Sequence, residues 1–146
     1  MFPRHTLLLL LSLLLSLLVA QVQADQDFSG LWVGTYKYAE DSPDPVLISV
    51  VFEHEGSEIK GRSLEVQTFG REPAIGLSAS LIGYNVPGDL FLVKKYDGSG
   101  GQTHAVDLEL NYVAEDNTLS GTWQLGDDSH GVITLVRMSN YLFEPE

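Results

Sequence analysis

The stretch HAVDLELNYV, residues His104–Val113, alternates apolar and polar side chains along almost its whole length. In an extended chain one face holds the residues His104, Val106, Leu108, Leu110 and Tyr112. The other face holds Ala105, Asp107, Glu109 and Asn111. This period of two predicts a β-strand with one face in a core and the other in water.

Seven further runs with strand-like composition, most of them alternating, lie between Asp25 and Met138, and no segment there shows a helical period. With His104–Val113, the expected strands are Phe28–Tyr38, Val46–Glu55, Glu58–Val66, Ile75–Tyr84, Asp89–Tyr96, Thr118–Leu125 and Gly131–Met138. Gly, Asp, Asn, Ser and Pro separate them, and the connections are too short for helical crossovers, so neighbouring strands must pair antiparallel. We predict an all-β fold, an eight-stranded antiparallel up-and-down meander that removes its edges by closing into a barrel.

The third expected strand does not alternate cleanly. Ile59 and Gly61 have one parity, whereas Leu64 and Val66 have the other. If all four face the core, the strand needs one extra residue, and we expect a β-bulge near Arg62.

The N-terminus has the pattern of a signal peptide. Arg4 and His5 precede an apolar run from Leu7 to Ala20, and small residues end at Ala24. The alternative is a membrane anchor, but the run is shorter than the ~20 residues that a spanning helix needs. We therefore expect residues 1–24 to be a signal peptide cleaved near Ala24, residues 25–138 to form the barrel, and residues 139–146 to be a C-terminal tail.

Composition excludes several classes of function. The 146 residues carry 20 acidic and 8 basic side chains, for a formal net charge of -12, so phosphate-backbone recognition and hence a nucleic-acid partner are not expected. Without cysteine the chain has no disulfide, no thiol nucleophile and no cysteine-based metal site. An exported acidic protein without disulfides fits a secreted or periplasmic location, and we expect no stable membrane insertion of the mature chain.

Two distant positions resemble a known family. Gly30 and Trp32 form a G-x-W at the start of the first expected strand, and Arg137 lies near the end of the last. This combination resembles the calycins, the superfamily of lipocalins, fatty-acid-binding proteins and avidins. The resemblance implies a lipocalin- or avidin-like barrel, closed at one end by Trp32 against Arg137, and a general ligand-binding role. The wider arrangement, with Gly-Thr-Trp at Gly121–Trp123 and Lys-Lys-Tyr at Lys94–Tyr96, also resembles the small lipocalin-like barrels of bacterial secreted proteins.

The candidate ligand site lies among inward-facing aromatic residues and one lysine. Lys94 and Tyr96 share a face of the fifth expected strand, so an inward Lys94 would put a cation in an apolar interior. The expected ligand-binding residues are Lys94, Tyr96, Tyr36, Tyr112 and Trp123. They would suit a small, mainly apolar ligand with an anionic end. In the alternative interpretation, Lys94 reaches water at the barrel mouth or pairs with a glutamate.

Signals for catalysis and for metals are weak. Histidines and serines match no hydrolase or metalloprotease spacing, and acids such as Asp127 fit turn chemistry better than a cation loop, so no cofactor and no metal site is predicted. We expect a ligand-binding barrel rather than an enzyme. The alternatives are a ligand-free envelope structural or protein-interaction module with a filled barrel, a calycin-type cyclase or isomerase, and an outer-membrane barrel, which the charged outward faces disfavour.

Overall fold

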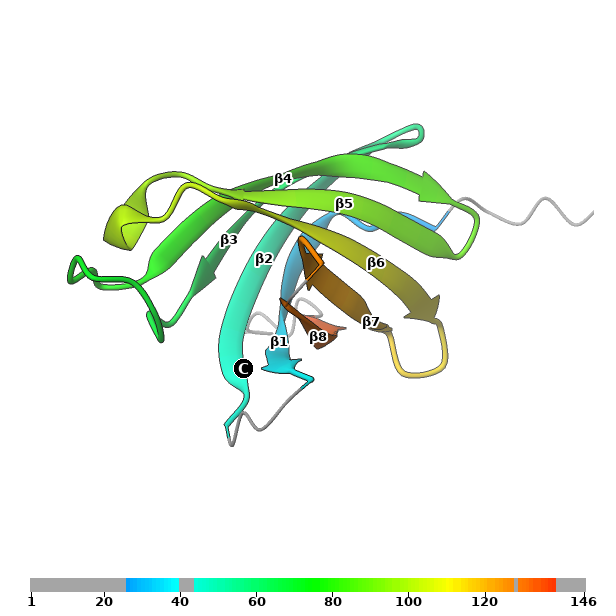
Figure 1. Ribbon diagram of the computed structural model, residues 1–146. Helices are drawn as coiled ribbons and strands as arrows, with labels where there is room; N and C mark the ends of the chain where they lie inside the picture. Colours follow the sequence, from blue (N-terminus) through cyan, green and yellow to red (C-terminus); the bar gives the residue numbers. More distant parts are fainter. Residues whose placement is uncertain (1–25, 40–43, 128, 139–146) are drawn as a thin grey trace, which may run out of the picture.

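The computed structural model describes residues 26–39, 44–127 and 129–138, and the expected signal peptide and C-terminal tail lie outside this part. Eight strands follow one another along the chain (Figure 1). They are β1 Gly30–Tyr38, β2 Val46–Glu55, β3 Glu58–Glu65, β4 Leu77–Val86, β5 Asp89–Tyr96, β6 Ala105–Val113, β7 Thr118–Leu125 and β8 Ser129–Arg137. A short 3-10 helix, η1 Ser99–Gly101, joins β5 to β6.

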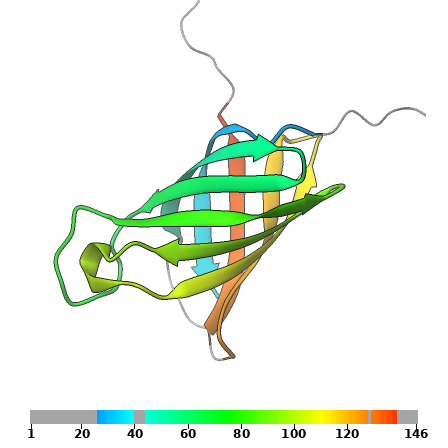
Figure 2. The same cartoon turned by 90° about the horizontal axis from the view of Figure 1, so that it is seen from above.

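The strands form one closed antiparallel barrel in sequence order, and β1 also pairs with β8 (Figure 2). The predicted fold class is confirmed. The expected bounds of β2, β5 and β7 are those observed, and the other strands differ by one or two residues at their ends. Within the described residues, no helix has the length and apolar character needed to cross a membrane.

Closure of so narrow a barrel bends the strands sharply, and glycines occupy the tightest places. A Cβ added to Gly34 on β1 would lie 1.8 Å from the carbonyl oxygen of Thr134 on β8. One added to Gly121 on β7 would lie 1.9 Å from the carbonyl oxygen of Glu109 on β6. These glycines therefore permit close approach of neighbouring strands and do not serve to free space for a ligand.

The expected bulge in the third strand is wrong. The pairing of β2 with β3 runs without interruption from Glu55↔Glu58 to Ile48↔Glu65. Strict alternation then turns Ser63 and Glu65 into the barrel, where both are buried, and turns Leu64 outward. Val66 is exposed as well. A continuous ladder keeps every backbone hydrogen bond, and the partners of the Glu65 side chain offset the burial of its charge.

The up-and-down order gives the barrel two different ends (Figure 2). We call them the Trp32 end, where the described chain begins, and the η1 end, which carries the β3–β4 connection and η1. At the Trp32 end the indole of Trp32 is fully buried and donates to the carbonyl oxygen of Phe28 at 2.9 Å. The guanidinium carbon of Arg137 lies 5.5 Å from the Trp32 ring centroid. Arg137 also donates to the carbonyl oxygens of Asp27 and Ser29, which ties the first residues to the last strand.

Candidate functional site

A buried polar cluster lies inside the barrel toward the η1 end. Its members are Lys94 and Tyr96 from β5, Glu65 from β3 and Tyr36 from β1. The Lys94 Nζ donates to Glu65 Oε2 at 2.5 Å and to the Tyr96 hydroxyl at 2.9 Å. The hydroxyls of Tyr96 and Tyr36 both donate to Glu65 Oε1, the latter at 3.3 Å. Three donors thus converge on one carboxylate.

Strand register explains how residues from non-adjacent strands meet. Strand β4 separates β3 from β5, and there Ala79 stands opposite Ser63 on one side and Tyr96 on the other. Because Ala79 is small and buried, the long side chains of Lys94 and Tyr96 pass over β4 to reach Glu65. The cluster therefore depends on the uninterrupted register of β3.

Burial controls the protonation of the cluster. Desolvation, followed by the influence of Glu65, raises the pKa of Tyr36 and of Tyr96 far above the ordinary 10.0, so both hydroxyls stay protonated and donate. Desolvation also lowers the pKa of Lys94 from 10.5, and the Glu65 carboxylate opposes that shift. With Lys94 only 4% exposed and the Glu65 side chain 0% exposed, each charge has the other as its compensating partner.

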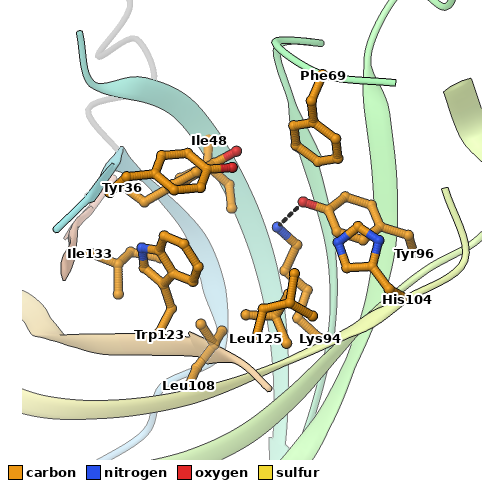
Figure 3. A pocket seen from close by; sticks show the side chains of 12 residues that line it. Tyr36, Ile48, Phe69, Lys94, Tyr96, His104, Leu108, Trp123, Leu125 and Ile133 are labelled. Atoms are coloured by element: carbon orange, nitrogen blue, oxygen red, sulfur yellow. Dashed lines mark hydrogen bonds between the residues drawn. The ribbon is translucent and has the colours of Figure 1, made fainter. Parts of the chain in front are cut away.

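A cavity of about 40 Å³ adjoins the cluster (Figure 3). Its walls come from Tyr36, Tyr38, Ile48, Phe69, Lys94, Tyr96, His104, Val106, Leu108, Trp123, Leu125 and Ile133. In Figure 3, Trp123 and Ile133 lie on one side of the space and Tyr96 with His104 on the other. The Trp123 indole is oriented by its N–H, which donates to the carbonyl oxygen of Lys37 at 3.0 Å. The cavity is mainly apolar, with one polar corner.

The β3–β4 connection covers part of this end through Phe69. The Phe69 ring packs edge-on against Tyr96 at 5.8 Å and contacts His104 at 5.9 Å between centroids. The connection is braced by the Gln67 carboxamide, which bonds the Glu72 carbonyl oxygen at 2.7 Å and the Ala74 N–H at 2.8 Å. Burial, together with the nearby Lys94 charge, lowers the pKa of His104 from 6.5. Neutral His104 therefore forms part of the wall at physiological pH.

The structure brings together four of the five expected ligand-binding residues: Lys94, Tyr96, Tyr36 and Trp123 all line the cavity. The fifth expected residue, Tyr112, does not line the cavity, and its expected position is corrected here. It lies at the Trp32 end, edge-on to Phe28 at 5.5 Å and to Trp32 at 6.4 Å, and its hydroxyl donates to Asn117 Oδ1. Tyr112 faces inward, as its parity required. The strand β6 has 9 residues, which is long enough for one face to reach both ends of the barrel.

Sequence reasoning missed Glu65 and Phe69. The inward position of Glu65 was not predicted, because the apolar Leu64 and Val66 on either side of it were assigned to the core. Keeping the period of two unbroken from Ile59 would have placed Glu65 inside the barrel. Phe69 lies in a connection, where alternation carries no information about direction.

Comparisons with known proteins identify the architecture alone. No family model matches the chain, and no curated protein matches it. Among solved structures, a redesigned β-barrel matches with a TM-score of 0.61 at 17% sequence identity, over 76% of this chain and 91% of that one. A match to a designed barrel at this identity reports the path of the backbone and carries no ligand or reaction with it.

Among the described residues, no group of three or more histidine, aspartate or glutamate side chains could hold a metal ion. The Glu65 oxygens are instead occupied by three protein donors. The site offers hydrogen-bond donors and acceptors, aromatic faces and a polar corner of zero net charge.

Proposed function

We propose that the protein binds a small, mainly apolar ligand inside the barrel at the η1 end. The observation that carries this proposal is the polar corner of Lys94 and Tyr96, with Glu65 bonded to both behind it, on the wall of an otherwise apolar, aromatic cavity. Such a cavity with a few convergent polar groups is the usual form of a small-molecule site. A protein that only needed a filled barrel would gain nothing from the desolvation of this pair, since well-packed apolar residues serve at least as well.

The chemistry of the corner favours a neutral ligand end. An anionic end, as expected from Lys94 alone, would have to compete with Glu65, which already accepts from the Lys94 ammonium and both tyrosine hydroxyls. A cationic end would meet the Lys94 charge. A hydroxyl or amide can instead exchange single hydrogen bonds with Lys94 or Tyr96 without adding an uncompensated charge. The ligand must be small, or displace Phe69, because the cavity measures about 40 Å³.

Binding is favoured over catalysis for the same reason. Within the polar cluster, Glu65 already accepts from three donors, one of them the Lys94 ammonium, and both tyrosines are held in the protonated form, so none of these groups is set up as a general base or a nucleophile. This arrangement supports a binding protein. The resemblance to the calycins agrees with it, and the contact of Arg137 with Trp32 supports that resemblance. Secretion or a periplasmic location belongs to the same proposal, and N-terminal sequencing of the exported protein should begin at Asp25.

The test uses the two tryptophans as built-in reporters. Trp123 lines the cavity, whereas Trp32 is buried at the opposite end, so the two indole N–H signals in a nitrogen-15 NMR spectrum report on different places. Hexan-1-ol, hexanoate and hexylamine are titrated separately. We expect the alcohol to shift the Trp123 signal with an affinity at least about tenfold higher than that of either ion, since tenfold corresponds to only 1.4 kcal/mol of charge desolvation.

Two variants sharpen the result. Replacing both Lys94 and Glu65 with methionine keeps the corner neutral and should abolish the preference for the alcohol, while Lys95→Met, at an exposed position of the same strand, should preserve it. A preference for hexanoate would restore the anionic-ligand hypothesis. Absence of any Trp123 shift up to millimolar probe, or equal shifts at Trp32, would remove the proposal.

The second candidate function is a filled barrel acting as a protein-interaction module. The small volume of the cavity favours it, because most of the interior is occupied by the chain's own side chains. The two candidates differ in one observable, a specific response of the Trp123 indole to a small molecule.

A further inference from the structure

The outer wall of the barrel has an uncharged apolar side that the ligand site does not explain. Cross-strand register aligns its outward residues in two neighbouring ranks over β8, β1, β2 and β3. One rank comprises Val136, Val33, Ser49 and Leu64. The next comprises Thr134, Thr35, Leu47 and Val66. We call these eight residues, together with the neighbouring Ile75, the outer face.

No ionisable side chain belongs to either rank, although the chain has a net charge of -12. Glu65 borders this region, but its carboxylate is inside the barrel against Lys94. Outward carboxylates occur elsewhere: Glu53, Glu55 and Glu58 are at the β2–β3 hairpin, and Asp107 and Glu109 are on β6. Two acidic copies of the chain would repel each other least with these neutral sides in contact.

The outer face is also shaped to fit itself. It contains a groove of about 480 Å³ lined by Val33, Leu47, Leu64, Val66 and Ile75 among others. At the border of this groove, Ile75 is 108% exposed, so its whole side chain projects into solvent. A two-fold contact places the same patch on both partners, and it therefore requires a projection and a recess on one surface. Ile75 and the groove supply both.

The size of the outer face sets the expected strength. Four strands about 4.8 Å apart, each with two outward residues over about 13 Å of its length, span an area on the order of 250 Å² in projection, to which Ile75 adds. The largest apolar patch of a typical monomer is of a similar order and is often functional. The outer face is about a third of the ~800 Å² that each partner contributes to a standard interface. The contact therefore suits a weak, reversible dimer and not an obligate one.

We propose that the partner of the outer face is a second copy of this chain, in a two-fold dimer with Ile75 of each copy seated in the groove of the other. The dimer leaves the η1 end of each barrel open, so it is compatible with ligand binding and does not depend on it. Because the two copies carry like charge, salt should strengthen the dimer, in contrast to an interface held by ion pairs.

Sedimentation velocity of the purified exported protein, from 1 to 200 µM, tests the proposal. We expect reversible dimerisation with a Kd of about 1–100 µM, the range of a transient contact of this size, tightening several-fold between 50 and 500 mM NaCl. Leu47→Asp should weaken it at least about tenfold by burying a carboxylate in the contact. Ile82→Asp is the matched control, since Leu47 is 62% and Ile82 54% exposed, both face outward, and Ile82 lies on β4 outside the groove lining.

Each alternative has a distinct result. Equal dimerisation of both variants would place the interface elsewhere and overturn the proposal. A wild-type chain that stays monomeric at 200 µM in 500 mM NaCl would also overturn it. Flotation of that monomer with phosphatidylcholine vesicles, lost in Leu47→Asp, would then assign the outer face to a lipid surface. Circular dichroism confirms that each variant is folded.

Discussion

At the scale of single residues, each end of the barrel contains one cationic side chain, and the two make different kinds of contact. Arg137 lies over the Trp32 ring and bonds two carbonyl oxygens at the Trp32 end, where its charge is partly in water. Lys94 is buried and is compensated by Glu65. The first contact adds packing and modest cation–π energy, whereas the second mainly avoids the cost of an isolated buried charge.

Lys94→Met should therefore be strongly destabilising, by about 3–5 kcal/mol, because it leaves the Glu65 carboxylate buried without its ammonium. Replacing Lys94 and Glu65 together with methionine should recover most of that loss. Urea denaturation measures the free energy of unfolding of each variant. Lys95→Met, at an exposed position, should stay within about 0.5 kcal/mol of wild type. A double variant no more stable than Lys94→Met would contradict the interpretation of Lys94 and Glu65 as mutually compensating buried charges.

At the Trp32 end, Trp32→Ala should cost about 3–5 kcal/mol as a large-to-small change of a fully buried side chain. Arg137→Ala should cost about 1–2 kcal/mol through lost stacking and packing. The double-mutant cycle should give a coupling of about 1 kcal/mol, since the two groups are in contact. Additive single effects would mean that Arg137 acts through the carbonyl oxygens of Asp27 and Ser29 alone.

At the scale of the elements, strand coiling and uninterrupted register are the conditions for both the barrel and the site. Glycines at the tightest bends let β1 approach β8 and let β7 approach β6. The pairing of β2 with β3 has no bulge, and the unbroken alternation of β3 therefore turns Glu65 into the interior. A change that shifts one strand by a residue would expose its core face and remove the cluster at once.

Gly34→Ala should consequently destabilise the barrel by about 1–3 kcal/mol or more, because its Cβ would meet the backbone of β8 and not a flexible side chain. Thermal denaturation followed by circular dichroism measures the change. Thr122→Ala, at an exposed outward position of β7, is the control and should lower stability by at most about 1 kcal/mol. A Gly34→Ala variant as stable as this control would mean that β1 and β8 can separate locally without opening the barrel.

At the scale of the whole molecule, the buried cluster links stability to alkaline pH. The folded state keeps Tyr36 and Tyr96 protonated, whereas the unfolded chain releases those protons above about pH 10. Above pH 10 the unfolded state then binds fewer protons, and stability falls by up to about 1.4 kcal/mol per pH unit for each tyrosine. Lys94 acts with the opposite sign: its lowered pKa makes stability rise with pH up to about 10.5.

Absorbance at 295 nm, which reports tyrosinate, measures this linkage. The chain has 6 tyrosines, and we expect Tyr36 and Tyr96 to ionise only in the step in which the far-ultraviolet circular dichroism is lost. In guanidinium all six should titrate together near pH 10. Complete ionisation in the folded protein before any loss of circular dichroism would show that the interior admits water at the cluster.

The sequence by itself determined the fold class, the antiparallel order of the strands and their bounds to within two residues. This was possible because period-two alternation and turn residues are local, and because His104–Val113 and most of its counterparts repeat the same signal. It also predicted that Tyr36 and Trp123 face inward, since parity fixes the face of a residue once one face is known to be buried. For Lys94, which shares a face with Tyr96, it left open an interior position, a place at the barrel mouth or a pair with a glutamate.

Only the tertiary structure decided at which end of the barrel each inward residue lies and which residue compensates Lys94. Tyr112 and Trp123 are both inward, yet strand tilt and register send one to the Trp32 end and the other to the cavity. Glu65 pairs with Lys94 across β4, a contact between residues 29 positions apart that no local pattern encodes. The apolar character of Leu64 predicted a core position. The β2–β3 ladder instead keeps all its backbone hydrogen bonds without a bulge, and Leu64 therefore faces outward.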